Sequence, residues 1–318
     1  MATNRVNVRR KEFSKPRFDF QRLIIPSVGL LLFAAIVFLA FGYFAKGFGF
    51  FGGAGNESTP VSDGNSAVIR VPPGGDLQAA VDKARGGDII ELQAGATYNE
   101  ITLPAKDISE FITIRTSAID RLPEDIRVSP SQSSQMAKII TRGGGKPAVE
   151  TKNGAHHFRF VGVEFAPSNT DYIYNLVYLA ASTDSVADVP HDLEFDRCYF
   201  HSISEGVARR GLALNSANTI VKNSYFEGFA FKGEESQGIC GWTGTKNVKI
   251  INNYIEGGAE NVMFGGFDPA NAELIPQDIE VRGNNFYKPA EWKGRTMKNL
   301  FEIKNAKRVQ FVGNYLVN

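Results

Sequence analysis

The chain has 318 residues, 43% of them hydrophobic and 22% charged, which excludes a fully disordered protein and allows one large domain or two ordinary ones. Its net charge of +1 is unevenly spread, because residues 1–22 carry seven Lys or Arg and two Asp or Glu, which leaves a net charge of −4 on the rest. An acidic main domain argues against nucleic acid as a partner, and two cysteines exclude a disulfide framework and a four-cysteine zinc site.

Residues 23–45 form an apolar run without a charged residue. At about 1.5 Å per residue, a helix of this length crosses a hydrocarbon core of roughly 30 Å. Seven basic residues precede the run, so the positive-inside rule predicts a cytoplasmic tail at residues 1–22 and places the rest beyond the inner membrane, in the periplasm or outside the cell. The competing interpretation is a cleaved signal peptide, whose apolar region is usually about 7–15 residues long. The greater length of this run favours an uncleaved, single-pass anchor.

A glycine-rich linker follows at residues 46–67. It contains six glycines together with Ser, Asn, Thr and Pro, a composition typical of flexible tethers. The linker separates the predicted transmembrane helix from residues 68–318, where we expect a folded domain.

This domain is built from a repeated pattern of six residues. Each copy begins with an apolar residue, continues with polar or small residues and ends with aromatic and apolar residues. The copies occupy residues 160–165, 195–200, 221–226, 250–255, 281–286 and 311–316. Their last residues are 35, 26, 29, 31 and 30 positions apart, which indicates a coil of variable length rather than a fixed helical repeat.

The fourth position of the pattern predicts a ladder of polar side chains. It is occupied by Val163, Cys198, Ser224, Asn253, Asn284 and Asn314. If successive coils stack, the asparagine amides lie above one another and can hydrogen-bond along the stack. The last position, Phe165 in the first copy and Leu316 in the last, is expected to stack in the same way inside the core. These features are typical of a parallel β-helix.

Further strands and one helix complete the predicted domain. A second strand per coil is expected at residues 175–180, 211–216, 238–242, 261–265 and 299–305, and earlier strands at 68–71, 88–92, 111–116 and 138–142. Residues 76–85 are predicted to form an amphipathic helix with Asp76 as its N-cap. Its apolar face consists of Leu77, Ala80, Val81 and Ala84. A helix at this place covers the open N-terminal end of a solenoid.

Residues 71–98, with the NNYI- and GNNF-type turns that follow, resemble the right-handed parallel β-helix proteins of the pectin-lyase-like superfamily, and above all bacterial repeat members without an assigned reaction. The resemblance covers residues 68–318 and implies an all-β, right-handed parallel β-helix. Many members are polysaccharide lyases, hydrolases or epimerases, and others are non-catalytic surface proteins. Because the sequence stops directly after the last pattern, we expect the domain to be truncated at its C-terminus.

Outward side chains on the second strands are the first candidates for a site. Strand residues alternate in direction, so Glu302 and Lys304 are expected to point outward from residues 299–305. Trp242 and Asn215 are expected at outward positions on other coils. Coils stack about 4.8 Å apart, which puts Trp242 and Lys304 roughly 10 Å apart on one face, where a sugar ring can stack on the tryptophan. The alternative is a solvated Glu302–Lys304 pair and a tryptophan that packs against a turn.

The loop at residues 265–278 is predicted to be the longest excursion between coils. Together with Glu260 and Asp268 it can border a groove, or hold a calcium ion through carboxylate and carbonyl oxygens, although no EF-hand spacing is present. A plain surface loop is the alternative interpretation.

The next loop, at residues 288–298, is basic and contains a tryptophan. Long loops on a rigid scaffold often carry function. We therefore predict candidate catalytic residues at Arg295, Lys298, Glu302 and Lys304, and candidate glycan-binding residues at Trp242, Trp292 and Asn215.

Histidine and cysteine add one alternative, a metal site at His191 and His201 with the nearby Asp192, Glu194 and Asp196, although it is not the expected arrangement. His156 and His157 are adjacent, and adjacent strand residues point in opposite directions, so a shared metal ion is not expected. Cys198 and Cys240 belong to strands about two coils apart, so a disulfide between them is not expected.

Two functions fit these observations. The resemblance implies an envelope protein that binds or cleaves an extracellular polysaccharide. An enzyme of this kind would be a lyase acting on a uronate-containing glycan, or a glycoside hydrolase. The alternative is a non-catalytic surface, adhesion or scaffold protein. The two differ in whether an acid, a base and a cation meet at one place on the coils.

Overall fold

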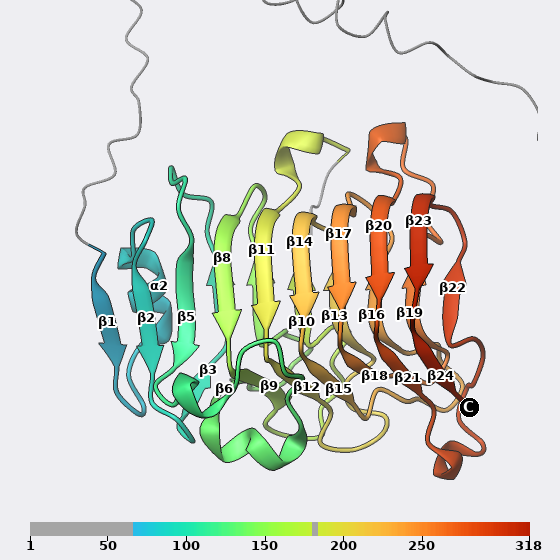
Figure 1. Cartoon of the computed structure of the whole chain (residues 1–318), viewed down its shortest axis with the longest axis horizontal. Helices are drawn as coiled ribbons and strands as arrows, with labels where there is room; N and C mark the ends of the chain where they lie inside the picture. The colour runs from blue at the N-terminus through green and yellow to red at the C-terminus, as the bar shows by residue number, and fades with distance from the viewer. Residues whose placement is uncertain (1–65, 180–183) are drawn as a thin grey trace, which may run out of the picture. The chain divides into compact units, whose positions relative to one another are not determined.

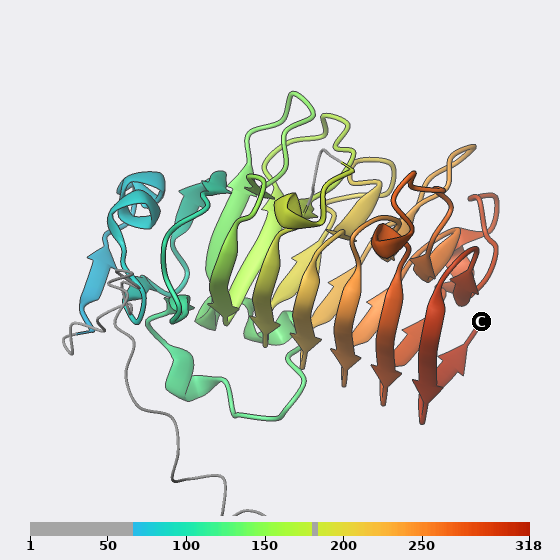
Figure 2. The same cartoon turned by 90° about the horizontal axis from the view of Figure 1, so that it is seen from above.

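The computed structural model of the chain describes residues 66–179 and 184–318, which form a parallel β-helix with three sheets, here named A, B and C (Figure 1, Figure 2). From the second coil onward, each coil contributes one strand to each sheet, in the order A, B, C, except that the last coil ends in sheet B. The predicted parallel β-helix is therefore confirmed.

The strands of the three sheets have the following bounds. Sheet A consists of β1 (Val68–Val71), β2 (Ile89–Leu92), β5 (Ile112–Thr116), β8 (His156–Val161), β11 (His191–Asp196), β14 (Ala217–Lys222), β17 (Lys246–Ile251), β20 (Gln277–Arg282) and β23 (Lys307–Val312). Sheet B consists of β3 (Thr97–Asn99), β6 (Ala137–Thr141), β9 (Val163–Pro167), β12 (Tyr199–His201), β15 (Tyr225–Glu227), β18 (Tyr254–Glu256), β21 (Asn285–Tyr287) and β24 (Tyr315–Val317). Sheet C consists of β4 (Ile101–Leu103), β7 (Val149–Thr151), β10 (Val177–Leu179), β13 (Arg210–Leu214), β16 (Gln237–Gly241), β19 (Glu260–Phe264) and β22 (Phe301–Ile303).

The predicted cytoplasmic tail and transmembrane helix lie outside the described residues, as does all of the predicted linker except Ser66 and Ala67. Within residues 66–179 and 184–318, no helix is both long and apolar enough to span a membrane.

The six-residue pattern spans the corner between sheet A and sheet B. Its first residues end a strand of sheet A, its third residue turns the chain, and its last residues lie in a strand of sheet B. The turning residues have φ between 53° and 65° and are Gly162, Arg197, Asn223, Asn252, Gly283 and Gly313. Glycine and asparagine adopt this left-handed conformation more readily than other residues, which explains why they recur at this position.

The predicted asparagine ladder is confirmed. Oδ1 of Asn284 accepts hydrogen bonds from the main-chain nitrogen (2.8 Å) and Nδ2 (3.0 Å) of Asn253. Oδ1 of Asn314 accepts the same two bonds from Asn284, both at 2.9 Å. Nδ2 of Asn284 also donates to the carbonyl oxygen of Ile250 (2.9 Å), and Ser224 continues the ladder through its main-chain nitrogen, 2.9 Å from Oδ1 of Asn253.

The predicted apolar column inside the core is confirmed for five of its six members, whereas the last, Leu316, is 44% exposed. Its members, in register from coil to coil, are Phe165, Phe200, Phe226, Ile255, Phe286 and Leu316. The rings of Phe200 and Phe226 stack with their centroids 4.3 Å apart. Each fully buried side chain of this size contributes about 1.5–3 kcal/mol to folding, so the column is a main source of stability.

The predicted capping helix is present as α2 (Leu77–Lys83), which ends two residues before the predicted end. Oδ1 of Asp76 accepts a hydrogen bond from the main-chain nitrogen of Ala79 (2.9 Å) and caps the helix as expected. Its buried residues are Leu77, Ala80 and Val81. The helix packs against β1 and β4 at the N-terminal end of the coils (Figure 1).

Short 3-10 helices lie in the loops between the strands. Their bounds are η1 (Ile119–Arg121), η2 (Pro130–Gln135), η3 (Val186–Asp188), η4 (Ala272–Leu274) and η5 (Ala290–Trp292).

The longest connection in the described part of the chain is residues 117–136, between β5 and β6, rather than the predicted 265–278. Figure 2 shows this loop, in green, running along the coils. Arg127 donates to the carbonyl oxygen (3.0 Å) and Oδ1 (2.9 Å) of Asn252, and the main-chain nitrogen of Val128 donates to the carbonyl oxygen of Asn223 (2.9 Å). The loop is therefore fixed to the corners of later coils. The six-residue pattern could not reveal it, because the loop contains no copy of that pattern.

Replacing Asn284 with alanine should destabilise the protein by roughly 2–5 kcal/mol, because the buried Asn253 N–H and Ile250 carbonyl lose their partner. Urea unfolding of the full-length protein measures this loss. Gln310→Ala, at an exposed position of sheet A, is the control and should change stability by less than about 0.5 kcal/mol. Equal unfolding midpoints for the two variants would contradict a structural role for the ladder.

Candidate functional site

The outer face of sheet C carries one side chain per coil at the same height along the strands. In register along this column are Tyr178, Ala213, Cys240, Met263 and Glu302. Their neighbours Leu212, Ile239 and Val262 belong to the core, so Glu302 points outward as predicted. Loops from sheet B reach this face where the strands begin, and loops to sheet A leave it where they end.

Buried polar side chains form a hydrogen-bonded chain across the beginnings of these strands. Arg210 donates from Nε to Oε1 of Gln237 (2.8 Å) and from Nη1 to Oδ1 of Asn175 (3.4 Å). Gln237 donates from Nε2 to Oε2 of Glu260 (2.8 Å). Each of these residues is at most 8% exposed. A connected buried network of this kind holds the guanidinium group of Arg210 in one position.

Glu260 ends this chain and is fully buried. Its Oε1 atom has no hydrogen-bond partner among the described residues. Burial raises the pKa of its carboxyl group, and the hydrogen bond from Gln237 opposes this shift. The neutral form of Glu260 is therefore more accessible than that of an ordinary glutamate, and a neutral carboxyl group can donate a proton.

The predicted calcium ligands Glu260 and Asp268 do not come together. Glu260 begins β19 and contacts Gln237, whereas Asp268 follows the end of this strand and accepts a hydrogen bond from Nδ2 of Asn305 (3.1 Å). The length of the strand separates them by roughly 13 Å, too far to share one ion. Within residues 66–179 and 184–318, no group of three or more His, Cys, Asp or Glu side chains is placed to hold a metal.

Two of the predicted catalytic residues, Lys298 and Lys304, converge on the carboxylate of Glu235, and Lys304 also contacts a third, Glu302. Lys298 forms an ion pair with Glu235, and Nζ of Lys304 lies 3.7 Å from Oε2 of Glu235. Nζ of Lys304 is also 3.8 Å from Oε1 of Glu302. The hydrogen bond from Lys298 lowers the pKa of Glu235. Arg295 does not join this group and pairs instead with Glu205.

The predicted glycan-binding residues are placed differently. Trp292 is only 3% exposed, so it cannot offer its ring to a sugar. Asn215 is only 1% exposed, so it is not available to a sugar, and its Oδ1 accepts hydrogen bonds from the main-chain nitrogens of Trp242 (2.9 Å) and Thr243 (3.3 Å). It shapes the turn that follows sheet C. Trp242 remains partly exposed, and the guanidinium carbon of Arg210 lies 5.1 Å from its ring centroid.

Sequence reasoning missed Tyr174, Arg209 and Arg210. The guanidinium carbons of Arg209 and Arg210 lie 4.7 and 4.8 Å from the ring centroid of Tyr174, which is 46% exposed. Hydrogen bonding with Arg210 and the positive charges of both arginines lower the pKa of Tyr174, although burial opposes the shift. The adjacent arginines at the start of a strand were the available signal, but the loop that brings Tyr174 to them has no sequence pattern.

Glu235 joins the two groups of residues into one site. Nε of Arg209 donates to the main-chain oxygen of Glu235 (2.7 Å), whose carboxylate contacts Lys298 and Lys304. We define the sheet C site as Tyr174, Arg209, Arg210, Glu235, Lys298, Glu302 and Lys304. Four cationic side chains face two carboxylates in this set, and Glu234, whose Oε2 lies 3.9 Å from Nε of Arg209, adds a third carboxylate at its border. The remaining cationic excess favours an anionic ligand.

The adjacent histidines also differ from the prediction. His157 has φ of 58°, so both rings turn to the same side and their Nδ1 atoms lie 2.6 Å apart. The ring of His191 stacks on that of His156 with centroids 4.7 Å apart. The expectation of opposite directions was wrong because it assumed regular strand geometry, which a left-handed residue interrupts.

Replacing Arg210 with glutamine should raise the pKa of Tyr174, because the largest influence that favours the phenolate is lost. Titration of tyrosinate absorbance in the full-length protein measures this, with Tyr174→Phe identifying which transition belongs to Tyr174. Arg209→Gln should produce a smaller rise. A Tyr174 transition that is unchanged in Arg210→Gln would contradict the described contact.

No family model matches the chain, and no curated protein matches it either. Among solved structures, the chain is similar to the crystal structure of an alginate lyase from Paenibacillus sp. str. FPU-7. The similarity covers 79% of this chain and 99% of that chain, with 14% sequence identity and a TM-score of 0.38. At this level the similarity assigns no activity to the chain.

Proposed function

We propose that the sheet C site binds an acidic polysaccharide and cleaves it by β-elimination at a uronate residue. The observation that carries this proposal is the contact of the Tyr174 ring with the guanidinium groups of Arg209 and Arg210. A base with a lowered pKa beside fixed positive charge is what proton removal next to a carboxylate requires.

The roles of the residues follow from the chemistry of the reaction. The arginines neutralise the uronate carboxylate, which makes the proton on the adjacent ring carbon, C5, more acidic. The Tyr174 phenolate takes this proton, the bond between C4 and the glycosidic oxygen breaks, and a double bond forms between C4 and C5. The departing oxygen receives the proton back from Tyr174, so the phenolate is regenerated. Lys298 and Lys304 bind carboxylates of neighbouring sugar units.

The exposed aromatic residues at the borders of sheet C support binding of a sugar chain. Tyr172 and Tyr174 are 40% and 46% exposed on the loop before β10, and Phe267 is 48% exposed on the loop after β19. Aromatic faces provide apolar contact for sugar rings while their edges remain in water. Tyr174 lies where the strands begin and Phe267 where they end, three coils further on. A sugar chain that contacts both would cross the face obliquely.

A non-catalytic surface or adhesion protein is the second candidate. The ion pairs of Glu235 with Lys298 and Lys304 favour it, because these two ammonium groups are already engaged and are not free to bind a substrate carboxylate. In that case the sheet C site binds an acidic glycan without breaking a bond.

The assay for both candidates incubates the full-length protein with alginate, polygalacturonate and neutral polysaccharides, with and without calcium. We expect ultraviolet absorbance from unsaturated uronates together with new reducing ends, on an acidic polymer only. Tyr174→Phe should lower the rate by roughly 10²–10⁴-fold. Tyr172→Phe is the matched control, because this neighbouring tyrosine hydrogen-bonds Glu234 instead (3.1 Å), and it should keep most of the activity.

Other outcomes of this assay separate the alternatives. Reducing ends without absorbance would indicate a hydrolase and contradict β-elimination. Binding of an acidic polymer without either signal would support the non-catalytic candidate. Equal rates for Tyr174→Phe and Tyr172→Phe would remove Tyr174 as the base.

We also propose that residues 23–45 anchor the protein in the inner membrane, with residues 1–22 in the cytoplasm and the β-helix on the opposite side. The uncharged run and the basic residues before it support this proposal. The N-terminal sequence of the mature protein from cell membranes is the test. A mature chain that lacks residues 1–46 would contradict an uncleaved anchor.

A further inference from the structure

A cavity of about 820 Å³ lies on the outer face of sheet A, beside residues 119–125 of the loop between β5 and β6. Its floor crosses β2, β5, β8, β11 and β14. At about 4.8 Å between strands, these elements span roughly 19 Å, so the cavity is an elongated trough. Its volume falls within the range of about 300–1,000 Å³ that is usual for ligand pockets.

The wall of the trough is held in place by the coils. Nη1 of Arg197 donates to the carbonyl oxygen of Leu122 (2.6 Å). Leu122 and Val128 are buried in a small apolar cluster with Met136 and Tyr199. The trough is therefore formed before any ligand arrives, which lowers the entropic cost of binding.

The floor of the trough mainly presents hydrogen-bond donors. The side chains of Arg115, Arg159 and Lys222 are 31%, 37% and 33% exposed. The carboxylates that pair with them, from Glu91 and Glu194, are only 16% and 12% exposed. Arginine and lysine side chains donate hydrogen bonds and accept none.

The wall presents acceptors instead. Asp120, Glu124 and Asp125 line the cavity and are exposed. Ionised carboxylates accept hydrogen bonds and donate none. A ligand in the trough therefore meets cationic donors on one side and anionic acceptors on the other. An anionic ligand is repelled by the wall and a cationic one by the floor, so an uncharged ligand fits best.

Hydroxyl groups complement such a site better than peptide groups. A hydroxyl group donates and accepts, and it rotates to suit its partners. An extended peptide presents N–H and C=O groups alternately along each edge. Its N–H groups on one edge would therefore face the donors of the floor, and its C=O groups on the other edge would face the acceptors of the wall. We propose that the trough binds an uncharged oligosaccharide, at a site separate from the sheet C site and independent of the activity proposed there.

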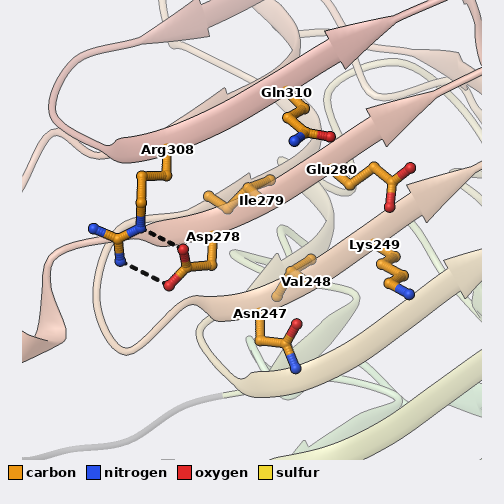
Figure 3. A pocket seen from close by; sticks show the side chains of 8 residues that line it. All are labelled: Asn247, Val248, Lys249, Asp278, Ile279, Glu280, Arg308 and Gln310. Carbon is orange, nitrogen blue, oxygen red and sulfur yellow. Dashed lines mark hydrogen bonds and ion pairs between the residues drawn. The ribbon is translucent and has the colours of Figure 1, made fainter. Parts of the chain in front are cut away.

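A smaller cavity on the same sheet supplies a control. Its volume is about 430 Å³, and all of its lining residues belong to β17, β20 and β23. Figure 3 shows Arg308 paired with Asp278 at one side of it and Lys249 beside Glu280 at the other. Arg308 lies on β23, three strands from β14, which is the nearest strand of the trough. Arg308→Ala therefore removes a cation from the same face without touching the trough.

The test is calorimetric titration of the full-length protein with neutral hexasaccharides of glucan, mannan and xylan type, with hexamannuronate, and with an uncharged hexapeptide. We expect at least one neutral hexasaccharide to bind. Arg159→Ala and Glu124→Ala should each weaken that binding, by about tenfold for Arg159→Ala. Arg308→Ala and Arg210→Gln should leave it unchanged.

Four results would overturn the inference. The first is that no neutral hexasaccharide binds, and the second is that Arg159→Ala binds the sugar as tightly as the unmodified protein does. The third is that hexamannuronate binds through Arg159 more tightly than the neutral sugars do. The fourth is that the peptide binds and no sugar does. Loss of acidic-glycan binding in Arg210→Gln alone concerns the sheet C site and leaves the trough unaffected. Because Arg159→Ala also removes an ion pair with Glu194, Glu124→Ala on the exposed wall separates lost binding from lost folding.

Discussion

Main-chain pairing between successive coils, at a spacing of about 4.8 Å, is the constraint on which the rest of this protein depends. It fixes the register of all three sheets, so residues at equal positions of neighbouring coils lie in columns. An asparagine column satisfies main-chain groups at the corner between sheets A and B, and an aromatic column fills the interior. The outward side chains also lie in columns, because each of them has a neighbour at the same position of the adjacent coil.

The outer faces use this order in different ways. On sheet A, opposite charges alternate between strands, as in the contacts of Glu194 with Arg159 and Lys222. Such a face is close to neutral. On sheet C, the loops bring two lysines and two arginines to one place, and the carboxylates of Glu234, Glu235 and Glu302 balance them only in part. A polymer that lies across the strands therefore meets a different charge on each face.

The sequence was sufficient for the features that depend on register. The recurring asparagine and the core column each leave a residue type at a fixed place in a repeat of about 30 residues. It was also sufficient for the outward direction of Glu302, because strand residues alternate in direction. These are short-range consequences of strand geometry.

The parts that could not be predicted depend on loops. Trp292 is buried because the loop that carries it folds back on the coils, and Asn215 is buried where its Oδ1 accepts hydrogen bonds from the turn of the next coil. Tyr174 contacts Arg210 although it lies 36 positions earlier in the chain. The loop that carries Tyr174 contains no copy of the repeated pattern. Loop conformation depends on contacts that are spread over several coils, and one sequence does not report them.

The loop between β5 and β6 changes how the array behaves as a whole. In most solenoids each repeat contacts only its neighbours, so the ends can open one coil at a time. Here Arg127 bonds to Asn252 and to the carbonyl oxygen of Gly283, 125 and 156 positions further along the chain. The coils between β5 and β20 cannot open separately unless the loop between β5 and β6 is released, so they form one cooperative unit. Closing a contact over such a distance in the chain also slows folding, because the entropy of the intervening segment is lost before the contact forms.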